Sequence, residues 1–198
     1  MKISKYIFLL SLILLRLNCQ VNNGTNPTDT QAEALVKDGW QQFETGNYAS
    51  ALGKFEEAIA IDSSYAEAFC GAGWSNARLT NLANSVSRFN HCISLNSSQV
   101  DAQAGLAFVY NAQKQYSSAI ASANKALSIS STYLFIHDQT IGFKDLQLIL
   151  AACYFAQGNF SQSLMFVKKL TPSFTANINT YEGKSALAEE IERLRGIV

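Results

Sequence analysis

The stretch KDGWQQFETGNYASALGKFEEAIAID, residues 37–62, joins two helix-forming runs through the short break TGNY. The glycine and asparagine of that break are residues that favour turns. Trp40 lies near the start of the stretch, Trp74 stands 34 positions later, and Phe108 stands another 34 positions on. A helix, a turn and a second helix that recur with one fixed period predict a stack of helical hairpins.

The repeat can be followed over four copies. With a shift of 34 positions, residues 32–65, 66–99 and 100–133 align, and the first two copies both begin with AEA. A fourth copy spans residues 144–172, after a ten-residue insertion, LFIHDQTIGF, at residues 134–143. Apolar residues at helical spacing stand on both sides of each break, which predicts two helices in every copy.

The end of the chain predicts one more helix, over residues 181–196. Leu187, Ile191 and Leu194 would share its inner face. A terminal cap needs a polar outer face. Charged residues supply it here: Glu189, Glu190, Glu192, Arg193 and Arg195.

These repeats resemble the tetratricopeptide repeat (TPR) family. The family positions kept in the first copy are Gly39, Gly46, Tyr48, Ala51, Phe55 and Ala58. The resemblance implies an all-α fold, a right-handed α-solenoid of about four helix-turn-helix units plus a C-terminal capping helix, formed by residues 32–198. It also implies that the first helices of successive units line the concave side.

One stripe on these first helices faces the concave side by the same resemblance. In the first unit Val36, Trp40 and Phe43 fall at i, i+4 and i+7, which is one helix face. We expect this stripe to form an apolar partner-binding groove made of Val36, Trp40, Phe43, Cys70, Trp74, Ala77, Phe108, Asn111, Leu148 and Phe155. Two arrangements stay open: the groove is exposed to a partner, or the insertion or the final helix folds back and covers it.

The stripe differs from the carboxylate clamp with which some members of the family grip acidic chaperone tails. That clamp uses Lys, Arg and Asn side chains, whereas only Lys37 and Arg78 stand near the edges of this apolar stripe. The sequence therefore argues against binding of chaperone tails.

The N-terminus predicts export. Residues 1–18 combine two lysines with an apolar run that is too short to span a bilayer, as in a signal peptide. Cys19 then resembles the lipidated cysteine of bacterial lipoproteins, although Arg16 and Asn18 depart from the usual residues around it. We expect a lipid anchor at Cys19, a flexible tether over residues 19–31 and a place in the bacterial cell envelope, facing the periplasm; an ordinary cleaved signal and an uncleaved anchor are the alternatives.

Composition excludes several classes of function. Lys+Arg and Asp+Glu are balanced at 15 each, so the chain lacks the basic excess that nucleic-acid binding requires. No metal-ligand spacing or nucleophile motif is present, and His137 with Asp138 forms a pair without a third convergent group. We therefore expect no catalytic residue, metal, cofactor or small-molecule substrate.

The sequence thus predicts a non-catalytic protein-protein interaction module that binds an extended or helical segment of a partner protein in its concave groove. The alternative is a structural subunit of an envelope assembly, for example outer-membrane or secretion machinery. Such a subunit would use its convex face or its cap, with the groove filled internally.

Overall fold

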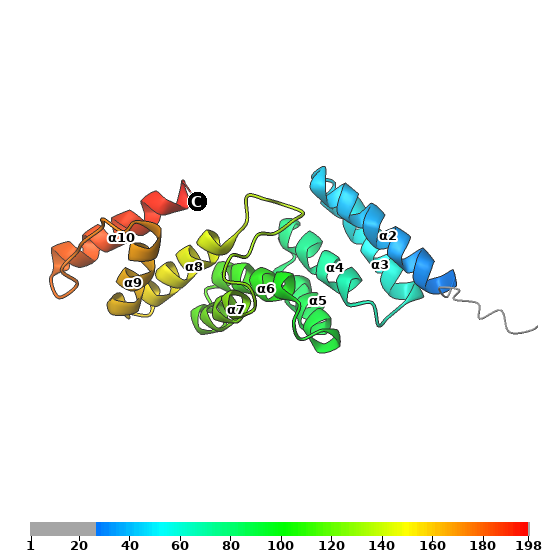
Figure 1. The fold of residues 1–198 in the computed structure, drawn as a ribbon, viewed down its shortest axis with the longest axis horizontal. Helices are drawn as coiled ribbons and strands as arrows, with labels where there is room; N and C mark the ends of the chain where they lie inside the picture. The colour runs from blue at the N-terminus through cyan, green and yellow to red at the C-terminus, as the bar shows by residue number, and fades with distance from the viewer. Residues whose placement is uncertain (1–26, 198) are drawn as a thin grey trace, which may run out of the picture.

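The computed structural model describes residues 27–197, and within that range the chain forms nine helices. Their bounds are α2 (Pro27–Glu44), α3 (Tyr48–Ile61), α4 (Ala66–Arg78), α5 (Leu82–Leu95), α6 (Val100–Ala112), α7 (Tyr116–Ile129), α8 (Phe143–Ala156), α9 (Phe160–Leu170) and α10 (Tyr181–Arg195). Figure 1 shows them as a curved array with α2 and α10 at opposite ends. The all-α helical repeat fold predicted from the sequence is confirmed.

Each hairpin turns through one residue in the left-handed backbone region. This residue is Gly46 in the first unit, with φ +81°, and Gly158 in the fourth, with φ +75°. Thr80 and Lys114 occupy the same position in the second and third units, with φ 61° and 59°. The next amide in each unit donates to a carbonyl five residues back, as from Asn47 to Gln42 at 2.8 Å. This arrangement ends a helix while satisfying its last carbonyl groups.

Two phenylalanines fasten successive hairpins together. The ring of Phe55 on α3 lies between Gly39 on α2 and Gly71 on α4, where an added Cβ would stand 2.7 and 2.3 Å from the ring. Phe89 on α5 repeats this arrangement against glycines of α4 and α6. Glycine is needed at these places because the ring fills the space that a side chain would take.

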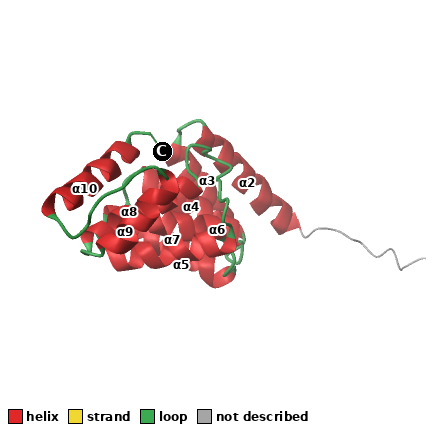
Figure 2. Ribbon diagram, turned by 60° about the vertical axis from the view of Figure 1, so that its left-hand side comes forward, coloured by secondary structure: helices red, strands yellow, loops and turns green. Residues whose placement is uncertain are grey.

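The two long connections precede α8 and α10, and both appear as loops in Figure 2. Residues 130–142 contain the insertion, and residues 171–180 lead to the last helix. Helix α10 packs on α8 and α9 with Leu187, Ile191 and Leu194 buried. Glu190 differs from the expectation of an outer position, because it is only 9% exposed and pairs with Arg193 at 2.5 Å.

The predicted signal peptide and Cys19 lie outside the described residues, so their assignment stays a prediction. Among the helices of residues 27–197, none has the length and apolarity that crossing a membrane would require.

Candidate functional site: the concave face and its covering segment

Residues 133–142, here called the covering segment, lie over the first helices of units one and two. The side chain of Phe135 is fully buried. Its ring stacks on Trp74, with centroids 4.4 Å apart, and meets Trp40 edge-on at 5.9 Å. Phe43 contributes a third ring at 6.0 Å. Figure 1 shows the loop before α8 on the side of the array opposite α5 and α7, which is the concave side.

Two polar side chains fix the covering segment at its tip. The imidazole of His137 stacks on the indole of Trp40 at 3.8 Å, and its Nδ1 lies 2.8 Å from Oε1 of Glu44 at the end of α2. Asp138 forms an ion pair with Arg78 at the end of α4. The segment is therefore attached to units one and two by His137 and Asp138, which belong to the insertion and not to the repeats.

Of the two arrangements that the sequence left open, the structure has the covered one. Most of the expected groove residues are buried: Val36, Trp40, Phe43, Cys70, Trp74 and Leu148. Ala77, Phe108, Asn111 and Phe155 are half-buried. The exposed alternative does not hold in this structure, because Phe135 fills the space between the two tryptophans. Contact of these residues with a partner stays a prediction.

The expected stripe does not form one continuous surface. Phe108 continues the aromatic row from Trp74, with ring centroids 6.1 Å apart. Further along, Asn111 is engaged between helices, because its Oδ1 accepts a hydrogen bond from the Cys153 thiol at 3.3 Å. Phe155 packs edge-on against Phe160 at the turn of the fourth unit. The structure thus brings Trp40, Phe43, Trp74 and Phe108 into one aromatic row, and Asn111 and Phe155 are engaged elsewhere.

Buried polar groups lie beneath the covering segment. The indole Nε1 of Trp40 donates to Oε1 of Glu67 at 3.0 Å, which joins α2 to α4. Burial raises the pKa of the Asp101 carboxyl on α6 above its ordinary value, while the Tyr133 hydroxyl and His137 act in the opposite direction. Burial, followed by the charge of Asp101, raises the pKa of Tyr133. The segment thus excludes water from ionisable groups as well as from aromatic rings.

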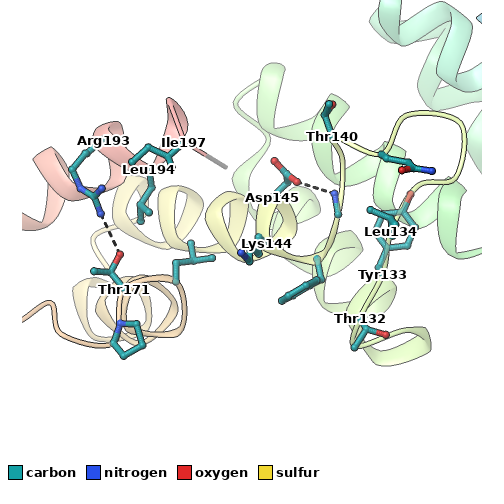
Figure 3. A pocket seen from close by; sticks show the side chains of 15 residues that line it. Thr132, Tyr133, Leu134, Thr140, Lys144, Asp145, Thr171, Arg193, Leu194 and Ile197 are labelled. Carbon is teal, nitrogen blue, oxygen red and sulfur yellow. Dashed lines mark hydrogen bonds between the residues drawn. The ribbon is translucent and has the colours of Figure 1, made fainter. Parts of the chain in front are cut away.

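A cavity of about 750 Å³ lies between the covering segment and the end of α10. Figure 3 shows its walls, with Leu134 on one side and Leu194 and Ile197 on the other. Arg193 lines the same cavity and donates to Thr171 at 3.3 Å. The walls combine apolar side chains with basic ones, since Lys144 is also part of the lining.

Within residues 27–197, no three His, Cys, Asp or Glu side chains are placed to hold a metal ion. The cysteines of this range, Cys70, Cys92 and Cys153, are buried free thiols. His137 and Asp138 are each engaged in an ion pair with a different helix.

Sequence reasoning named the insertion as one possible cover of the groove, but it gave Phe135, His137 and Asp138 no part in that cover. The structure shows that successive side chains of the segment face opposite ways. Phe135 and His137 point inward, while Leu134 and Ile136, which are 52% and 69% exposed, point outward. The segment then turns back on itself, because the amides of Asp138 and Ile141 donate to carbonyls three residues back.

No protein-family model matches the chain. Over 61 residues the chain is 43% identical to Ethylene-overproduction protein 1 and to ETO1-like protein 2, both from Arabidopsis thaliana. The matched stretch is 28% of this chain and 6% and 7% of those two proteins, so the chain spans only a small part of their length.

The fold is similar to two crystal structures of MamA, with TM-scores of 0.61 and 0.60 at 19% and 16% identity. The similarity covers 86% and 87% of this chain and 78% and 99% of those chains. The first TPR domain of Spaghetti (RPAP3), bound to the HSP90 peptide SRMEEVD, is similar with a TM-score of 0.54 and 20% identity, over 62% of this chain and 93% of that one.

An O-GlcNAc transferase mutant from Thermobaculum terrenum is also similar, with a TM-score of 0.58 and 14% identity over 86% of this chain and 27% of the enzyme chain. Together these likenesses show a TPR-like α-solenoid fold.

Proposed function

We propose that the protein is a non-catalytic interaction module whose concave face binds an extended segment of a partner protein. One observation carries the proposal: the concave face already holds a looped segment of the chain, with Phe135 in contact with the rings of both Trp40 and Trp74. A surface that accepts one chain segment has side chains that can accept another. The peptide bound to the similar RPAP3 domain is consistent with this use of the fold.

The cavity beside the covering segment offers room for a partner to extend. Its apolar walls suit aliphatic or aromatic side chains, and Lys144 suits an acidic one, whereas Arg193 is already paired with Glu190 and Asp145 adds a carboxylate to the lining. A partner that enters here would contact the exposed outer side chains Leu134 and Ile136 before it reached the tryptophans.

Site-specific photo-cross-linking tests this proposal. A photoreactive residue at Ile136, on the covering segment, should capture a discrete protein partner in the cells that make the protein. The matched position is Met165 on α9, a second helix of its hairpin, where the side chain is 39% exposed. Capture at Met165 and none at Ile136 would contradict binding on the concave face and favour the alternative of a structural subunit.

We also propose that the module is exported in bacteria and held at the cell envelope through a lipid on Cys19. The proposal depends on the signal-like residues 1–18 and the polar stretch that follows Cys19. Metabolic labelling with an alkyne fatty acid should mark the wild-type protein and leave Cys19→Ala unlabelled. The same mature mass for both proteins, without label, would refute the lipid anchor.

A further inference from the structure

The covering segment is bonded mainly to itself. The Phe135 amide donates to the carbonyl of Ile141 at 2.9 Å, and the Phe143 amide donates to that of Tyr133 at 2.7 Å. The amides of Asp138 and Ile141 also find acceptors within the segment. Its described attachments to α2 and α4 are made by side chains, through ring stacking and two ion pairs. Such a unit can leave its seat without breaking a backbone ladder.

The seat beneath the segment has three parts with different chemistry. An aromatic box of Trp40, Phe43 and Trp74 takes the ring of Phe135. The outer face of the Trp40 indole, beside Glu44, takes a flat ring whose nitrogen faces the Glu44 carboxylate. Arg78 takes a carboxylate. The segment fills these places in the order Phe135, His137 and Asp138.

One donor in the seat is left unused. The indole Nε1 of Trp74 is buried and has no hydrogen-bond partner among the described residues. A buried donor without an acceptor weakens the closed arrangement. An incoming segment that placed a carbonyl there would gain a hydrogen bond that the chain's own segment does not provide.

From these contacts we infer that the covering segment is a displaceable internal ligand and that the partner carries the same pattern. The partner segment presents an aromatic side chain, a flat side chain with a ring nitrogen or an N–H group two positions later and a carboxylate directly after that. This inference rests on the proposed function and specifies the ligand of the same site. The internal segment sets a threshold, because a tethered competitor acts at a high effective concentration.

The test uses a fluorescent peptide of residues 131–143, STYLFIHDQTIGF, and measures its binding to the full chain by anisotropy. In His137→Ala/Asp138→Ala the internal segment loses both polar attachments, while the seat keeps its residues. We expect this variant to bind the peptide at least tenfold more tightly than wild type. His91→Ala is the control, because His91 packs on Phe69 outside the seat and should leave binding at the wild-type level.

Two further binding measurements test whether the peptide occupies the same seat as the covering segment. A peptide in which alanine replaces Phe135, with Phe143 kept, should lose binding to the double variant. Adding Arg78→Ala should weaken binding, and adding Arg88→Ala should not. The two arginines are matched, because both side chains are 34% exposed and each pairs with a carboxylate and lies over an aromatic ring.

A double variant that keeps its helical circular dichroism and binds no better than wild type would overturn the inference, as would equal binding of the alanine peptide. If the double variant does not fold, Phe135→Leu replaces it, with the same expectation and the same overturning result. Capture of a partner at Ile136 despite a failed peptide assay would remove this inference alone. Peptide binding with capture only at Met165 would remove the proposed function and the partner pattern that rests on it, and would leave only the finding that the internal segment can be displaced.

Discussion

The imidazole of His137 lies parallel to the indole of Trp40, with ring centroids 3.8 Å apart and an interplanar angle of 3°. The stack joins the first helix of the described chain to an insertion that follows the third unit. Together with Phe135, the imidazole covers Trp40, which the repeat pattern placed on the concave face, so that this tryptophan is part of the core. Stability and binding therefore involve the same residues.

Trp74→Ala should lower the free energy of unfolding by about 3–5 kcal/mol, as expected for truncation of a buried aromatic side chain. The indole is 2% exposed and contacts the rings of Phe89, Phe108 and Phe135. Urea denaturation followed by circular dichroism measures the change. A urea unfolding curve close to that of wild type would show that the concave face is open in solution.

Gly71→Ala should destabilise the protein by about 1–3 kcal/mol, because the added methyl would overlap the ring of Phe55. Gly53→Ala is the matched control within α3, where nothing stands within 4 Å of an added Cβ. That change should raise stability by about 0.5–1 kcal/mol through helix propensity. Opposite shifts in thermal melting are expected, and shifts of the same sign would contradict the packing described here.

Thr80→Gly should stabilise the protein by about 0.5–1 kcal/mol. Thr80 holds φ 61°, a backbone conformation that is unfavourable for a β-branched residue and open to glycine. Gly46→Ala at the equivalent turn should destabilise by about 1 kcal/mol, because its φ is +81°. Chemical denaturation of both variants gives the comparison, and a loss of stability in Thr80→Gly would argue against strain at that turn.

Asp101→Asn should become more stable relative to wild type as the pH rises. Burial raises the folded-state pKa of Asp101 above the ordinary 3.8, so the folded protein holds this proton more tightly than the unfolded chain. Its contribution is therefore most favourable below pH 3.8 and declines as pH rises through the folded pKa. Denaturation of both proteins between pH 3.5 and 8 should show the difference growing and then levelling off; a constant difference would mean that Asp101 is not desolvated.

The repeat architecture was predictable because it depends on local rules. Gly39, Phe55 and Gly71 recur as Gly73, Phe89 and Gly105, and this pattern indicates helices that approach closely. Hydrophobic periodicity and turn residues then place each helix.

The state of the groove was not predictable in the same way. It depends on contacts between residues distant in sequence, such as Phe135 with Trp74 and Asp138 with Arg78. The sequence around one residue of such a pair does not indicate which distant residue it will contact. Leu134, Phe135 and Ile136 are three consecutive apolar residues, so the pattern of the insertion did not indicate which side chain would face the groove.

The covering segment also changes how the solenoid resists unfolding. In a simple repeat array each hairpin contacts only its neighbours, so the terminal hairpin can fray independently. Here His137 and Asp138, in the insertion before α8, are anchored on α2 and α4, which adds a long-range link to a chain of nearest-neighbour contacts. The first three hairpins are thereby coupled into one cooperative unit, and their slowest amide protons should exchange together. Lifting the segment would return the array to independent fraying from its N-terminal end.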